Sequence, residues 1–496
     1  MDRQRRSPTV TTAPERGEPH GTVLAGQRYP ASRAQLKPKA EGGRAVQRHR
    51  RAAARVGSRT AVDLYPADDE AGNPYTGIRR ASPRRRDEVT TARPVSNRNL
   101  QEIGFALVLN LHQPAGNLER LLATQEWAAK EILWAIDRIP RSLWPFEDLG
   151  RVHLSLSGTL LETLTDPAFQ QRVYGTVDCG SLLWYLQNTR TIDILGTGYY
   201  HPVLPLIPPA DWPEQLERWH GLATHLFHRS SFAGFWPPEM GFTMELIPSL
   251  RRLGYRYVLV DSEHVEPLSP MRWEEIRYRP HLAQFGGEQI VVVVRDRELS
   301  DAQEAGCDVN WFLREVQART RHCEFPPLVT TATDGENGGW FRNTTPGANF
   351  WTAFHADLLG RVSHGQAHGV RPTFIHDYLD RHGAHDWVQV GPGAWNTGWH
   401  HGTGFVQWTG SLAQQQALTR VGELSQAVHA ARRNASGIGA TDPDLYGHLE
   451  QALWRVLRAE TSCNFFWGED WVGQCHRDLD VATQHLDAAG ERFGLR

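Results

Sequence analysis

The chain has 496 residues, of which 40% are hydrophobic and 22% are charged, and its formal net charge is −3. This composition excludes a wholly disordered protein, and the length suits two to four domains or one large α/β barrel with additions. No apolar run reaches the ~18 residues that a membrane-spanning helix needs, so the sequence predicts that the protein is not an integral membrane protein.

Five scattered cysteines form neither a disulfide framework nor a Cys-x-x-Cys zinc motif. The N-terminus lacks the apolar core of a signal peptide, so we expect a cytoplasmic protein. In residues 1–98, basic side chains outnumber acidic ones by about two to one and no strand or helix period is sustained. We therefore predict a disordered basic tail. Such a tail could tether nucleic acid, but it lacks the interleaved aromatic residues of single-strand binders, and a solvated extension is the simpler interpretation.

Short apolar runs of buried-strand length recur after residue 99, and longer segments with helical periodicity separate them. The runs are Phe105–Leu111, Val152–Leu156, Thr191–Leu195, Tyr255–Val260, Ile290–Val294 and Leu328–Ala332. Strands that alternate with helices form a parallel sheet with right-handed crossovers. We predict an α/β fold in which residues 99–410 form a (β/α) barrel. The periodicity is helical from residue 411, which predicts a C-terminal α-helical domain at 411–496 that completes the active site.

Polar side chains follow two of these runs, at the positions where parallel barrels carry their catalytic groups. The first run ends at His112 and Gln113, before a proline that stops the strand. The third run leads into a loop with Tyr200 and His201, where the histidine again stands close to a proline. Each loop could be a structural turn, but two such loops are less expected by accident.

Carboxylates follow two further strand ends. Glu239 comes after Trp236 and two prolines. Burial among aromatic residues would perturb its pKa, which is typical of catalytic groups. The alternative interpretation is a structural glutamate at a helix N-terminus. Asp334 and Glu336 follow the last run and precede two glycines, which let a backbone approach a ligand; a calcium loop is less favoured because the EF-hand pattern is absent. Two carboxylates on separate strand ends are the minimum for glycoside hydrolysis or transfer.

Together these four loops resemble glycoside hydrolase family 57. His112–Pro114, Gly198–Pro202, Trp236–Glu239 and Thr333–Gly339 are similar to its first four conserved regions, in the family's order. The resemblance implies an incomplete (β/α)7 barrel followed by a helical domain, and a retaining mechanism on α-glucans such as amylose, malto-oligosaccharides and glycogen. It assigns the nucleophile to Glu239 and the acid/base to Asp334. Family members are mostly metal-independent in catalysis, so no cofactor is expected.

In the family, the helical domain contributes a Ser-Asp-Trp-type segment to the site. The closest match is Ala459–Trp471, where we place Asn464 at the position of the acid. The loop at 391–404 is dense in Gly, Trp and His and is predicted to be the last active-site loop. For each tryptophan, packing between barrel and helices is the alternative to sugar contact. We expect the substrate to be bound by a set of aromatic and polar side chains: His112, Gln113, Tyr200, His201, Trp236, Glu336, Trp395, Trp399, His400, Trp408, Asn464 and Trp467.

Two other classes of protein remain open on the sequence. A metal-dependent barrel enzyme, such as a polysaccharide deacetylase or an α-mannosidase, would use His112, His201 and Asp334 as zinc ligands. A non-catalytic relative would bind glucan without cleaving it. The motifs do not separate hydrolysis from transfer, and they give neither the linkage preference nor the oligomeric state.

Overall fold

The structure is a computed structural model that describes residues 101–493, except 396 and 398–403. These residues belong to one compact unit, which spans residues 93–496. The predicted basic tail at 1–98 lies outside the described residues. Among the helices that the structure does describe, none is long and apolar enough to cross a membrane.

Seven parallel strands of the described chain follow one another around a barrel. They are β1 (Ile103–Leu111), β2 (Val152–Leu156), β3 (Ile192–Leu195), β4 (Gly234–Phe235), β5 (Tyr257–Asp261), β8 (Glu288–Arg295) and β9 (Leu328–Asp334). β1 pairs with both β2 and β9, and a bridge from Gly196 to Phe235 joins β3 to β4. A backbone hydrogen bond from Asp296 to Thr330 joins β8 to β9. The strands are rich in Val, Ile and Leu because both of their faces are buried.

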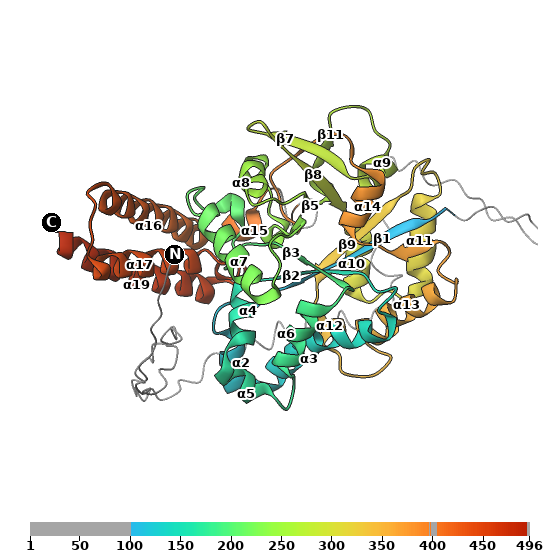
Figure 1. The fold of residues 1–496 in the computed structure, drawn as a ribbon, viewed down its shortest axis with the longest axis horizontal. Helices are drawn as coiled ribbons and strands as arrows, with labels where there is room; N and C mark the ends of the chain where they lie inside the picture. The colour runs from blue at the N-terminus through green and yellow to red at the C-terminus, as the bar shows by residue number, and fades with distance from the viewer. Residues whose placement is uncertain (1–100, 396, 398–403, 494–496) are drawn as a thin grey trace, which may run out of the picture. The chain divides into compact units, whose positions relative to one another are not determined.

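Helices that connect the strands cover the barrel (Figure 1). In α3, the buried residues Ala129, Ile132, Leu133 and Ile136 recur at the three- and four-residue spacing of one helix face. The connecting α-helices are α2 (Asn117–Thr124), α3 (Glu126–Leu143), α4 (Gly158–Thr165), α5 (Pro167–Val173), α6 (Cys179–Asn188), α7 (Trp212–Phe227), α8 (Ile247–Arg252), α9 (Trp273–Tyr278), α10 (Arg297–Ala305), α11 (Val309–Thr320), α12 (Gly338–Arg342) and α13 (Ala356–Ser363).

Four further strands pair with barrel strands or with one another. β7 (His281–Phe285) pairs antiparallel with β8, β11 (His385–Val390) runs parallel to β7, and β6 (Val265–Pro267) pairs antiparallel with β11. β10 (Val370–Pro372) runs parallel to the start of β1.

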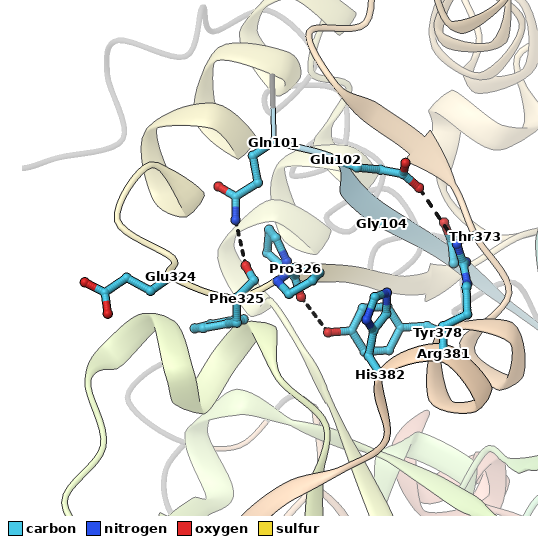
Figure 2. A pocket seen from close by; sticks show the side chains of 11 residues that line it. Gln101, Glu102, Gly104, Glu324, Phe325, Pro326, Thr373, Tyr378, Arg381 and His382 are labelled. Atoms are coloured by element: carbon cyan, nitrogen blue, oxygen red, sulfur yellow. Dashed lines mark hydrogen bonds and ion pairs between the residues drawn. The ribbon is translucent and has the colours of Figure 1, made fainter. Parts of the chain in front are cut away.

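Helix α14 (Ile375–His382) closes the N-terminal end of the barrel. Its residues Ile375, Tyr378 and Leu379 are buried in one cluster with side chains of β1 and β5. Figure 2 shows the pocket of about 390 Å³ just outside this closure, where the Tyr378 hydroxyl donates to the Pro326 carbonyl oxygen at 2.5 Å. Catalytic groups of parallel barrels lie at the opposite end.

The C-terminal region is helical. It contains α15 (Val406–Thr409), α16 (Leu412–Gly437), α17 (Pro443–Ala459), α18 (Cys463–Phe466) and α19 (Glu469–Phe493). The long helices α16, α17 and α19 pack side by side (Figure 1). Ser411 caps the start of α16 by accepting a hydrogen bond from the Gln414 backbone N–H. An α/β barrel followed by helices is the fold that the sequence predicts.

Candidate active site

A cavity of about 620 Å³ opens at the C-terminal ends of β1, β4 and β9. Barrel loops, helices α2 and α3, and the segment around α18 all contribute to its walls. Both Glu239 and Asp334 line it, although they follow strands that are far apart in the sequence. The other polar lining residues include Asn110, His112, Gln113, His201, Arg295, Asn337 and Arg342, and the aromatic ones are Trp127, Trp395, Phe466, Trp467 and Trp471.

Glu239 is presented by a tight turn directly after β4. Its φ of 56° is left-handed, which costs a residue other than glycine about 1–2 kcal/mol. The two prolines before it end the strand, and Met240 N donates back to the Pro237 carbonyl oxygen at 2.7 Å. The Trp395 backbone N–H also donates to the Glu239 carbonyl oxygen at 3.1 Å. The surrounding chain therefore fixes the strained turn that aims this carboxylate into the cavity.

The Glu239 carboxylate accepts two hydrogen bonds. Ser462 Oγ donates to Oε1 at 2.7 Å, and Trp395 Nε1 donates to Oε2 at 3.0 Å. Burial raises the pKa of Glu239 to about 7, and the charge of Asp334 also raises it, whereas the two hydrogen bonds act in the opposite direction. Because both partners are donors, they stabilise the ionised form that a nucleophile requires.

Asp334 ends β9 opposite Asn110 of β1. Asn110 Nδ2 donates to Oδ1 and Asn337 Nδ2 donates to Oδ2, both at 3.1 Å. Burial raises the pKa of Asp334 above its ordinary value, although these two hydrogen bonds and the charges of Arg342 and Arg295 lower it. A carboxyl group whose pKa is raised can carry a proton closer to neutral pH, as a general acid must.

Glu336 lies behind the wall of the cavity and is fully buried. Its Oε1 accepts from the His112 backbone N–H at 3.0 Å and from Gln113 Nε2 at 3.2 Å. Burial, followed by the charge of Asp334, raises its pKa to about 8. The sequence predicts that Glu336 contacts the substrate, but Glu336 does not line the cavity. Its carboxyl group is turned inward and holds the loop that follows β1.

His112 and His201 stack in the cavity wall with ring centroids 4.1 Å apart. Burial lowers the pKa of His112 well below its ordinary value and that of His201 to about 3, so both rings are neutral near pH 7. Among the described atoms, His112 Nδ1 and His201 Nε2 lack a hydrogen-bond partner. Neutral imidazoles with a free nitrogen can bond sugar hydroxyls. Within the described part of the chain, no group of three or more His, Cys, Asp or Glu residues could hold a metal ion.

The predicted tryptophans divide into two groups. Trp395 and Trp467 line the cavity, and Trp467 is 59% exposed. Trp236 is buried in the barrel interior because alternate residues of an extended chain face opposite sides, and Phe235 before it faces outward into the other core cluster. Trp408 is buried beside Phe466 under the helical region. For these last two, packing replaces the predicted sugar contact.

Tyr200 and Asn464 line a small separate pocket. Asn464 Nδ2 donates to the Ala459 carbonyl oxygen at 2.9 Å and is buried. Successive residues of a helix point about 100° apart, so Cys463 rather than Asn464 faces the cavity. Asn464, which we placed at the position of the family's acid, therefore does not line the cavity. Trp399 and His400, which the sequence predicts to bind substrate, lie outside the described residues.

Three residues that contact the two carboxylates, and a fourth that contacts His112, escaped the sequence analysis. Asn110 and Asn337 bond Asp334, Ser462 bonds Glu239, and Cys463 Sγ lies 3.5 Å from His112 Nε2. A signal existed for Asn110, because it is the one polar side chain in the first apolar run. Ser462 lies within the segment that the resemblance marks, where the Ser-Asp order matches Ser462 and Cys463.

The chain matches known proteins over its barrel. Residues 100–368 match the sequence profile described as Glycosyl hydrolase family 57. The chain is 28% identical over 201 residues to an α-amylase of Pyrococcus horikoshii and 29% identical over 206 residues to a 4-α-glucanotransferase of Thermococcus litoralis. Each match covers 40% of this chain, which spans only 29% and 28% of those relatives. An exo-type maltose-forming amylase from Pyrococcus sp. ST04 shares the fold, with a TM-score of 0.60, 14% identity, and coverage of 79% of this chain and 81% of that one.

Proposed function

The chain belongs to glycosyl hydrolase family 57, and from its site we propose that it is a retaining glycoside hydrolase or transglycosylase that acts on α-glucans. The observation that carries this proposal is the pair of carboxylates, Glu239 and Asp334, that line one cavity, each held by two hydrogen-bond donors. Aromatic side chains beside them suit the flat faces of glucose rings. Relatives named α-amylase and 4-α-glucanotransferase support an α-1,4-linked substrate.

In the first step, an ionised oxygen of Glu239 attacks the anomeric carbon of a bound glucosyl unit. The bond from that carbon to the glycosidic oxygen breaks, and its electron pair goes to the leaving oxygen, which takes the proton of Asp334. A covalent glucosyl-enzyme remains. The donors Ser462 and Trp395 stabilise the ionised carboxylate before attack and hold it in a fixed direction. The carboxylate loses its charge as the covalent bond forms.

In the second step, Asp334 acts as the base. It takes a proton from a water molecule or from a sugar hydroxyl, whose oxygen attacks the anomeric carbon and releases the Glu239 carboxylate. Water gives hydrolysis and a sugar hydroxyl gives transfer. Two displacements restore the α configuration, and this mechanism requires the two carboxyl groups to lie about 5–5.5 Å apart.

The neutral histidine pair supports the binding of an uncharged sugar. Protonated imidazoles would place positive charge beside Glu239 and weaken it as a nucleophile, whereas burial keeps the pKa values of His112 and His201 low. Both histidines line the cavity, and the partly exposed ring of Trp467 at its rim provides a stacking surface for a glucose unit. A polysaccharide or oligosaccharide substrate suits such a wall.

Product analysis tests the proposal. Purified protein is incubated with maltoheptaose and with amylose, beside the Glu239→Ala variant, and the products are separated by chain length. New longer and shorter oligomers that the variant does not form would establish transfer, and shorter products alone would establish hydrolysis. If neither substrate changes while the protein is folded, the assignment to α-1,4-glucans is wrong.

A further inference from the structure

A buried polar cluster lies outside the active-site cavity, where α7 meets the helical region. It consists of Asp211, Gln215, Ser425, His429 and Glu460, and we call it the α7–α17 cluster. All but His429 are at most 1% exposed. Asp211 Oδ2 accepts from Ser425 Oγ at 2.5 Å, and Asp211 Oδ1 lies 2.6 Å from His429 Nε2. The mechanism above uses none of these residues.

Glu460 is the member of the cluster whose hydrogen bonding is incomplete. Its Oε2 accepts from Gln215 Nε2 at 2.8 Å, whereas its buried Oε1 lacks a donor among the described atoms. Burial, followed by the neighbouring Asp211 carboxylate, raises the pKa of Glu460 well above its ordinary value. Two buried carboxylates in contact do not both ionise. A protonated Glu460 can donate to the Asp211 carboxylate, its neighbour in the cluster.

The cluster is connected to the nucleophile along two short paths. On the first, Gln215 Oε1 accepts from the backbone N–H of Tyr200 at 3.0 Å, which fixes the loop that ends in His201. On the second, the chain runs two residues from Glu460 to Ser462. There Ser462 N donates to the His201 carbonyl oxygen at 3.0 Å, and Ser462 Oγ donates to Glu239 at 2.7 Å. A shift of Glu460 would therefore move Ser462 and, through Gln215, the loop that carries His201.

We propose that Glu460 is a positioning residue for Glu239: as a neutral carboxylic acid it donates to Asp211, accepts from Gln215 and so holds Ser462 against the nucleophile. The role in catalysis rests on the proposed function, but the positioning itself does not. Glutamine is neutral and has the same shape, with one donor end and one acceptor end. The inference therefore requires that Glu460→Gln preserve the contact and that Glu460→Ala lose it.

The charged and titratable groups that face Glu460 come from each element packed against it. Asp211 precedes α7, and His429 on α16 contacts Asp211. Cys475 lies on α19, where burial and then the charge of Asp478 raise its thiol pKa, and an ionised Glu460 would add to that shift. None of these three is an arginine or a lysine. Ionisation of Glu460 at high pH would therefore place a second negative charge beside Asp211.

The decisive experiment titrates Glu239 without substrate. Protein labelled with ¹³C at the glutamate carboxyl carbons is followed by NMR, and the Glu239 signal is identified by its loss in Glu239→Gln. Removing a hydrogen bond to a carboxylate raises its pKa, so we expect Ser462→Ala and Glu460→Ala each to shift the Glu239 titration upward by about one pH unit. Glu460→Gln should leave it unchanged. A folded Glu460→Ala with an unshifted Glu239, or a Glu460→Gln shifted as far as the alanine variant, would overturn the proposal.

A second measurement uses only wild type and Glu460→Gln, in case the alanine variant does not fold. The pKa of Glu460 is higher in the folded than in the unfolded state, so its contribution to stability is complete below its ordinary pKa of 4.5 and is lost as pH rises through the folded value. Wild type should therefore lose thermal stability relative to Glu460→Gln as the pH rises above 4.5 toward the folded pKa of Glu460. A gap that does not change with pH, or a glutamine variant that does not fold, contradicts a neutral Glu460.

Failure of this inference and failure of the proposed function give different results. Neither the titration of Glu239 nor the unfolding of the Glu460→Gln variant requires turnover. A protein that leaves α-glucans intact but shows the expected titrations would refute the proposed function alone. An active enzyme whose Glu239 titrates identically in all four proteins would refute the positioning role alone.

Discussion

Replacing Trp395 by phenylalanine removes one hydrogen bond from the nucleophile and keeps an aromatic ring in its place. Trp395 Nε1 donates to Glu239 Oε2 at 3.0 Å. A hydrogen bond to a charged group is worth about 1.5–3 kcal/mol, which corresponds to about one to two pH units. The pKa of Glu239 should rise from about 7 to about 8 or 9. At pH 7, the ionised fraction then falls from about one half to about one tenth or one hundredth, and kcat/KM falls by about five- to fiftyfold.

The assay is the pH dependence of kcat/KM on maltoheptaose. Activity requires ionised Glu239, so it is lost as pH falls through the pKa of this group, and the acid limb should move upward in Trp395→Phe. Trp467→Phe is the matched control, because Trp467 lines the same cavity but has no hydrogen bond to Glu239. An acid limb that stays in place in Trp395→Phe, or that moves as far in the control, would refute the reasoning.

Three further predictions concern the acid, the barrel and the loop support. Asp334→Asn should lower kcat on maltoheptaose by about 10²–10⁴-fold, and it should lower kcat much less on an aryl glucoside with a good leaving group. Equal losses of kcat on the two substrates would contradict the role of a general acid. Gly196→Ala should cost about 1–3 kcal/mol in denaturant unfolding, because the new methyl group meets the buried ring of Tyr255, and unchanged stability would contradict this packing. Folding raises the pKa of Glu336 from 4.5 to about 8. Wild type should therefore lose thermal stability relative to Glu336→Gln as the pH rises across that interval. Parallel curves of melting temperature against pH would contradict a protonated Glu336.

Apolar runs predicted most of the barrel because buried parallel strands need hydrophobic residues on both faces. The runs at 105–111, 152–156 and 328–332 fall within β1, β2 and β9. β4 is absent from these runs because it has only two residues, although a strand end was predicted before Glu239, and its position depends on the bridge from Gly196 to Phe235. The strands β6, β7, β10 and β11 were missed as well. Each of these strands contains exposed residues, so their sequences do not form a continuous apolar run.

The site was predictable where function depends on one residue after a strand. Glu239 lies four residues after the end of β4, Asp334 is the last residue of β9, and both line the cavity. Side-chain direction was not predictable at Trp236 or Asn464, since a single residue of register decides whether a side chain faces the cavity or the core. The inward turn of Glu336 depends on two donors from a loop more than 200 residues earlier in the chain, and no local pattern encodes that contact.

The two parts of the site have different origins along the chain. Both carboxylates lie within residues 100–368, the segment that matches the family profile, whereas both donors to Glu239, Trp395 and Ser462, lie beyond it. The matched segment therefore contains the proposed nucleophile and the proposed acid/base. The remainder of the chain donates two hydrogen bonds to Glu239, and we propose that Glu460 positions the donor Ser462. Substitutions of Trp395 or Ser462 that remove these hydrogen bonds should consequently move the pH range of activity while leaving the reaction type unchanged, because the two acids stay the same.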